Sequence, residues 1–384
     1  MSSQQPPARA APEAGSTTPR SALPRSLIVL LGAAGAVAVG AGIKGAAGII
    51  APAMLALALT IAVLPIGTWA RRHGWPGWLA TTTALVAAYA ILLSLLAGTV
   101  VCLVRFVNLL PQYAGRSKEL TAELNGWMSS LDLSGGTTAD ALKKIEPSTL
   151  VSALTDVLGA ITGAAGSLFF LVTVMFFFVT AVPGFGPRMA ALSRSKPELA
   201  HSLGRFVTGT QRYLVVTALF GAIVAVLDTG ALWMLGIPLP LVWGFFSFIT
   251  NFVPNIGFVI GVVPPALLGL LEGGWERMLL VIVIYSVLNV TIQTFIQPRY
   301  VGATVGLSAE MTFMSLVVWT FLLGPLGALL AVPMTLLVRA LFIDSDERTA
   351  WVTPLFETTV AIELEPDPGA GTGTRLTTNG PSPA

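Results

Sequence analysis

Four polar side chains recur at intervals of four along one otherwise apolar segment, residues 278–297. They are Tyr285, Asn289, Gln293 and Gln297. Because an α-helix places residues four apart on one face, they predict a polar stripe about three turns long. Phenol and amide groups can contact an ion or a polar solute, and they can also hold neighbouring helices together. The stripe alone leaves both interpretations open, a translocation path or an adhesive contact.

The sequence after the stripe favours the first interpretation. Pro298 follows the stripe directly, and Gly302 and Gly306 lie a few residues further on. A helix end followed by a flexible loop exposes backbone carbonyls and amides suited to contact with an ion or a substrate. We therefore predict that Pro298 and Gly302 belong to the substrate path.

A second polar break interrupts the apolar segment 241–271. Asn251 and Asn255 flank Pro254, and Gly257 follows closely. Unpaired backbone groups at membrane depth are tolerated only inside protein or beside a wet cavity. This pattern predicts a broken or re-entrant helical hairpin whose asparagines face the polar stripe.

Two carboxylates are candidate groups for coupling transport to a proton or sodium gradient. Asp228 lies within the apolar segment 212–235, and Glu310 lies at the start of the last hydrophobic block. A charge in a membrane helix costs a few kcal/mol, so it should face a partner or water. For Asp228 the alternatives are a structural hydrogen bond to a neighbouring helix and a position near the outer interface.

The composition defines the class of protein that positions these groups. The 384 residues are 54% hydrophobic and only 10% charged, with a mean hydropathy of +0.80, whereas soluble domains carry about 25% charged residues. A single cysteine excludes a disulfide framework, and a net charge of +2 without a basic cluster argues against a nucleic-acid surface. The sequence has no phosphate-binding loop and no histidine beside a nucleophile or metal ligand, so we expect no enzyme, cofactor or metal site.

The hydrophobic pattern predicts an all-α polytopic membrane protein with about eight hydrophobic segments, including one or two broken or re-entrant hairpins. Residues 1–26 and 344–384 predict disordered tails, the second acidic and then rich in Gly, Thr and Pro. The membrane domain should span 27–343. Its expected segments are a Gly/Ala-rich hairpin of 27–43 and 46–67, then 78–104, 158–182, 212–235, the hairpin 241–271, 278–297, and a block after 307 that either crosses twice or is re-entrant.

Charge predicts the sidedness of these segments. Cytoplasmic loops carry an excess of Lys and Arg, so the paired arginines Arg71 and Arg72 and both termini are expected inside. A re-entrant 241–271 also places Arg299 inside. The polar insertion 105–157 then lies outside the cytoplasm, where its helical spacing of leucines predicts a small pair of amphipathic helices.

The C-terminal half contains a series of Pro- and Gly-containing motifs: Pro254-x-Ile256-Gly257 with Pro264, Gln297-Pro298, Gly302, Gly306-Leu307, and Gly324-Pro325-Leu326-Gly327-Ala328-Leu329-Leu330-Ala331-Val332-Pro333. In these motifs the chain resembles the AI-2E family of bacterial transporters, also described as autoinducer-2 exporter-like or PerM-type permeases. The similarity covers roughly residues 25–345.

The resemblance implies an oligomeric, multi-pass protein of the bacterial inner membrane that exports autoinducer-2 or exchanges cations for protons. Two positions depart from the family pattern. Ile292 stands where many members have an acid, and Ala303 stands where a basic residue often occurs. A carboxylate-dependent mechanism would therefore have to use Asp228 or Glu310.

Three classes of function follow from these observations. The first is a secondary transporter for a small polar signalling molecule or ion. The second is a channel-like oligomer that passes small solutes without coupling. The third is an envelope scaffold that transports nothing and acts through the insertion 105–157. The expected partners are the lipid bilayer, the solute and further copies of the chain.

Overall fold

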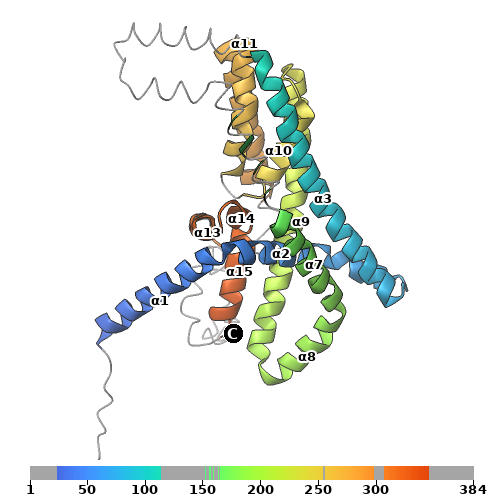
Figure 1. Ribbon diagram of the computed structural model, residues 1–384, viewed down its shortest axis with the longest axis vertical. Coiled ribbons are helices and arrows are strands. Elements are labelled where there is room, and N and C mark those ends of the chain that lie inside the picture. Colours follow the sequence, from blue (N-terminus) through green and yellow to red (C-terminus); the bar gives the residue numbers. More distant parts are fainter. Residues whose placement is uncertain are drawn as a thin grey trace, which may run out of the picture.

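A computed structural model describes residues 24–113, 165–253, 256–297 and 307–345, with a few isolated positions between 152 and 163. All regular structure within these ranges is helical (Figure 1). This confirms the expected all-α polytopic membrane protein. The predicted tails, apart from their innermost residues, and most of the predicted insertion lie outside the described residues. Within the described residues, five helical stretches are long and apolar enough to cross a membrane: Ala47–Arg72, Gly77–Tyr113, Gly166–Ser195, Pro197–Met234 and Pro325–Phe342.

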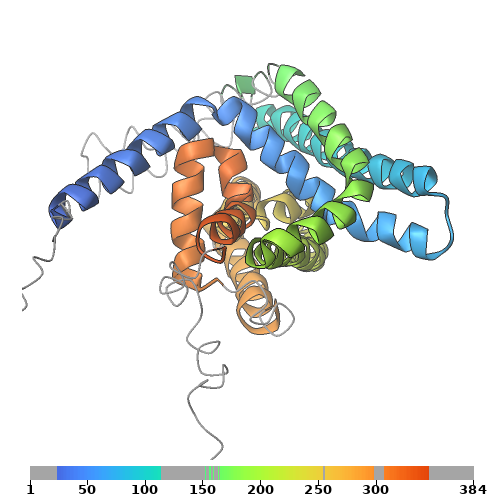
Figure 2. The same ribbon diagram turned by 90° about the horizontal axis from the view of Figure 1, so that it is seen from below.

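The first two helices form one bent arm. Only Ala46 separates α1 (Arg25–Gly45) from α2 (Ala47–Arg72), and α2 continues away from α1 instead of folding back along it (Figures 1 and 2). Because α2 does not fold back along α1, the predicted hairpin of 27–43 and 46–67 is wrong.

Small residues join α2 to the next two membrane helices, α3 (Gly77–Leu109) and α7 (Ala165–Ala181). Ala56, Ala84 and Ala88 are buried in this contact with larger side chains of α7. Alanine lets helix backbones approach closely, which favours packing where lipid removes the usual hydrophobic driving force. A short 3₁₀ turn, η1, extends α3 to Tyr113.

The longest helix, α9 (Pro197–Met234), contacts both halves of the molecule (Figure 1). It follows α8 (Phe185–Ser195), which reaches α7 through the 3₁₀ turn η2 (Val182–Gly184). The first part of α9 packs on α15 (Ala331–Phe342), and its last part packs on α10. The helix thereby links the polar breaks to the C-terminal block.

The predicted break in 241–271 is a helical hairpin. The first leg, α10 (Pro240–Thr250), has 11 residues and spans only about 16 Å, too short for a hydrocarbon core of about 30 Å. The second leg opens α11 (Gly257–Val290), which is itself divided where Gly273 and Gly274 leave helical geometry. Gly274 has a φ of 73°, a conformation that glycine adopts without a steric penalty.

The C-terminal block contains a second tight hairpin. Helices α13 (Ala309–Leu323) and α14 (Pro325–Leu329) reverse at Gly324, whose φ is 70°. Gly327 lies against α13 so closely that an added Cβ would be 1.9 Å from the Trp319 carbonyl oxygen. The following α15 leaves this hairpin in a different direction (Figures 1 and 2).

Contacts between turns group the segment ends into two sets. Tyr113 at the end of α3 donates a hydrogen bond to Glu272, which precedes the turn within α11. The α2–α3 turn meets the turn after α7, because Arg71 and Pro183 line one shallow hollow. Each pair joins segment ends for which the charge pattern predicts a common side of the membrane.

Candidate functional site

A buried polar cluster occupies the contact between α9, α10 and α11. Asp228 of α9 is fully buried, and Ser247 of α10 donates a hydrogen bond of 2.5 Å to its Oδ2. Tyr285 and Asn289 of α11 are also buried and lie beside this carboxylate. The cluster therefore brings side chains together from three helices.

A chain of amide hydrogen bonds continues from this cluster. Gln293 Nε2 donates to Asn289 Oδ1 at 3.0 Å and to Asn251 Oδ1 at 2.9 Å. Asn289 in turn donates to the Tyr285 carbonyl at 2.9 Å. The polar stripe is therefore in direct contact with Asn251 of the polar break in 241–271.

Glycines on α9, α10 and α11 make this approach possible. A Cβ on Gly244 would lie 2.8 Å from the Ala225 carbonyl oxygen, and a Cβ on Gly221 would lie 3.1 Å from Asn251 Nδ2. At Gly257 a Cβ would overlap the Thr250 carbonyl oxygen at 2.0 Å. Gly257 thus allows α11 to begin directly against the end of α10.

Two atoms of the cluster have no hydrogen-bond partner among the described residues. They are Asp228 Oδ1 and the Tyr285 hydroxyl. Within the same part of the chain, Asp228 forms no ion pair, and no group of three His, Cys, Asp or Glu side chains could hold a metal ion. The cluster is thus a lone carboxylate among neutral hydroxyl and amide groups.

The other predicted coupling residue, Glu310, lies elsewhere. It is exposed in the first turn of α13, after Ser308, whose Oγ accepts a hydrogen bond from the Met311 amide. An acid at this position interacts favourably with the helix dipole. The geometry gives Glu310 a helix-capping environment and does not bring it to the cluster.

The remaining predicted residues adjoin the cluster in sequence. Gln297 is half-buried at the end of the π-helix η3 (Thr291–Ile296). Pro254, Asn255, Pro298 and Gly302 lie outside the described residues.

Three features of the site escaped sequence reasoning. Ser247 was not singled out, because a serine in an apolar segment carries no positional signal. The π-helix was also missed, and such segments often occur at functional sites. The third feature is the surroundings of Ile292, the position at which many family members have an acid. Ile292 packs with Phe220 and Val224 of α9, so this position is apolar here. The carboxylate of Asp228 lies one helical turn after Val224 on α9.

Comparison with known proteins identifies the family. The AI-2E family transporter pattern matches residues 27–345, so the chain belongs to this family of transporters. It is 31% identical to the protein YhhT of Escherichia coli (strain K12) over 310 residues, which cover 80% of this chain and 88% of the relative. It is 29% identical to the AI-2 transport protein TqsA of the same strain over 302 residues, covering 78% and 86%.

A more distant relative extends the comparison. The chain is 25% identical to MT0215 of Mycobacterium tuberculosis (strain CDC 1551 / Oshkosh) over 299 residues, which cover 74% of this chain and 80% of the relative. Together with the apolar helices, family membership makes the chain a multi-pass protein of the inner membrane.

Proposed function

We propose that the chain is a secondary transporter that exports a small polar signalling molecule or ion through the contact of α9, α10 and α11. One observation carries the proposal. Among the described residues, Oδ1 of the buried Asp228 carboxylate has no hydrogen-bond partner, and neither has the nearby hydroxyl of Tyr285. Unpaired polar atoms in a membrane interior cost free energy. Such atoms are expected where a proton, an ion or a solute completes their interactions during transport.

The contact between the polar break at Asn251 and the polar stripe supports the proposed course of the substrate path. Asn251 ends the short helix α10 and accepts a hydrogen bond from Gln293 in the π-helix. Discontinuous membrane helices are the elements with which transporters bind ions and polar solutes. Pro254, Asn255, Pro298 and Gly302 complete this path, with the Gln297-Pro298 loop as its cytoplasmic gate.

Asp228 is the coupling group of this mechanism. It lies within the cluster, and no cationic side chain of the described residues neutralises it, so a proton or a sodium ion can bind there. Glu310 takes no part in coupling. The name of TqsA makes AI-2 the first solute to test.

Flux in proteoliposomes tests the function. The purified chain is reconstituted, and movement of AI-2 and of sodium is measured with and without an imposed proton or sodium gradient. We expect flux that depends on one of the gradients. Flux independent of both would indicate a channel, and absence of flux for every solute would favour a scaffold.

Two substitutions test the path itself. Gln293→Leu and Asn255→Leu should abolish flux while the protein still accumulates in the membrane, because each replaces an amide of the proposed path by an apolar side chain of similar volume. Gln293→Leu also removes the hydrogen bonds to Asn251 and Asn289. Asn108→Leu, at an exposed position of α3, is the matched control and should transport normally. Unchanged flux in both path variants would contradict the proposed path.

A further inference from the structure

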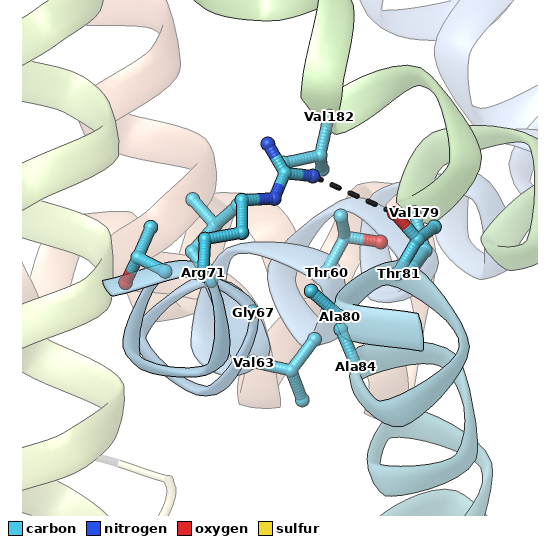
Figure 3. Close-up of a pocket in the computed structure, with 11 residues that line it drawn as sticks. Thr60, Val63, Gly67, Arg71, Ala80, Thr81, Ala84, Val179 and Val182 are labelled. Atoms are coloured by element: carbon cyan, nitrogen blue, oxygen red, sulfur yellow. Dashed lines mark hydrogen bonds between the residues drawn. The ribbon is translucent and has the colours of Figure 1, made fainter. Parts of the chain in front are cut away.

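An open slot lies between α2, α3 and α7 (Figure 3), and none of its lining residues belongs to the polar cluster. It is a narrow crevice of about 30 Å³, and its walls are mostly apolar, with Val63, Ala84, Val179 and Val182 among them. Gly67 and Ala80 make room for it between the helices. Its apolar walls therefore suit contact with part of a hydrocarbon chain that lies along the opening.

One cationic side chain stands at the mouth of the slot. Arg71 extends from α2 over the opening, and its guanidinium donates a long hydrogen bond of 3.5 Å to Thr81 Oγ1 (Figure 3). Thr81 in turn donates to the Gly77 carbonyl at 3.0 Å, so its hydroxyl positions the guanidinium. A guanidinium has five N–H donors, and none of the described residues that line the slot or the hollow beside it is acidic. The N–H donors of Arg71 that do not contact Thr81 can therefore bind an anionic ligand at the mouth of the slot.

The surroundings of Arg71 are those of a membrane interface. Trp78 is 71% exposed and lines the adjoining hollow together with Thr82 and Pro183. Trp69 and Trp75 are exposed nearby. Tryptophans gather at the level of lipid headgroups, where one part of the ring is apolar and the N–H is wet. This places the guanidinium at headgroup depth and the slot below it at acyl-chain depth.

We propose that this slot binds one anionic phospholipid. The headgroup phosphate accepts charge-assisted hydrogen bonds from Arg71, and part of one acyl chain lies between α2, α3 and α7. An arginine fork matches a phosphate oxygen pair, while apolar walls give a free phosphate ion nothing to contact. Arg188, whose guanidinium lies over Gly184 next to Pro183, adds positive charge that favours an anionic headgroup.

Lipid retention by the full-length protein tests the site. The purified chain is delipidated in detergent, and binding of dioleoyl phosphatidylglycerol and dioleoyl phosphatidylcholine is titrated by native mass spectrometry. Arg71→Gln should weaken phosphatidylglycerol binding about tenfold, as expected for loss of a charge-assisted contact. Arg72→Gln, which removes the same charge from an exposed residue outside the slot, should change it less than about twofold.

Equal losses in the two arginine variants would show diffuse attraction to a basic surface and would overturn the proposal. The acyl chain is tested with Gly67→Leu. An added Cβ at Gly67 makes ordinary contact with Ala84 at 3.5 Å, so the remaining side-chain atoms extend into the slot. This variant keeps Arg71 but should lose phosphatidylglycerol to the same extent as Arg71→Gln, and parental affinity would contradict the assigned position of the acyl chain.

Inorganic phosphate separates a lipid site from an anion site. Phosphatidylglycerol should raise the melting temperature of the parent chain and not that of Arg71→Gln. Inorganic phosphate at the same ionic strength should leave both unchanged. Equal stabilisation by phosphate and by lipid would mean that Arg71 binds an anion alone.

Discussion

Two buried polar clusters differ in how completely their hydrogen bonds are formed. In the contact of α13 with α15, Ser315 donates to the Ala331 carbonyl at 2.8 Å and is hydrogen-bonded to Thr335, while Trp319 Nε1 donates to Thr335 Oγ1 at 3.0 Å. We call this the closed cluster. In the cluster of α9, α10 and α11, Asp228 Oδ1 and the Tyr285 hydroxyl have no partner among the described residues. We call this the open cluster.

The difference distinguishes two roles of polar side chains inside a membrane, holding helices together and binding a ligand. A cluster with every polar side-chain atom paired holds helices together and offers nothing to a ligand. A cluster with unpaired atoms contributes less to stability but keeps the capacity to bind. Substitutions in the closed cluster should therefore reduce stability, and substitutions in the open cluster should reduce transport.

The largest loss of stability is expected at a feature that both regions have, a glycine packed directly against a backbone carbonyl. Gly257→Ala places a Cβ 2.0 Å from the Thr250 oxygen, and Gly327→Ala places one 1.9 Å from the Trp319 oxygen. Backbone must move in both, so we expect a loss of about 3 kcal/mol or more and little folded protein by fluorescence-detected size-exclusion chromatography. Gly204→Ala in α9, where a Cβ meets nothing within 4 Å, should fold like the parent. Normal yield and melting of either variant would contradict the close packing.

The next effect should appear only in transport. Asp228→Asn removes the charge of the open cluster but keeps its shape, so gradient-driven flux should fall about tenfold or more. The melting temperature should stay the same or rise, because a neutral amide is cheaper to bury than a carboxylate. Glu310→Gln removes an exposed acid and should leave flux unchanged. Equal flux in the two variants would remove Asp228 from the mechanism.

Thr335→Val should show the opposite result, with reduced stability and unchanged transport. It leaves Trp319 Nε1 without its acceptor and breaks the contact with Ser315, which should cost about 1–3 kcal/mol. Flux per folded molecule should not change. Thr208→Val is the control, because its exposed hydroxyl bonds only to its own helix at the Gly204 carbonyl. Reduced flux per folded Thr335→Val would show that the closed cluster also takes part in transport.

The sequence predicted contacts well where polar residues occur in apolar membrane segments, because such residues have few structural roles there. An amide stripe in an apolar helix and two asparagines around a proline both indicated polar contacts, and Gln293 does meet Asn251. The pairing of Asp228 with Ser247 was not predictable, because it depends on the close approach of α10 to α9 at Gly244. That approach is a property of two helices and not of either segment alone.

The two acids illustrate the same limit. Asp228 and Glu310 were equivalent candidates from sequence, yet one is fully buried and the other is exposed in the first turn of α13. Ser308 before Glu310 was an available signal for a helix start. The hairpin predicted for α1 and α2 was wrong because two apolar segments in close succession do not reveal whether the second folds back on the first or continues from it, as α2 does.

The smallest effect comes from removing single tyrosine hydroxyls, one without a partner and one that is hydrogen-bonded. Tyr285→Phe deletes a buried hydroxyl that has no partner among the described residues, so the melting temperature should be unchanged or slightly raised, while flux should fall about threefold if the hydroxyl contacts the transported species. Tyr213→Phe deletes a hydroxyl that donates to the Phe252 carbonyl at 3.2 Å, so its melting temperature should fall. Destabilisation by Tyr285→Phe would mean that its hydroxyl has a structural partner, and the open cluster would then be adhesive like the closed one.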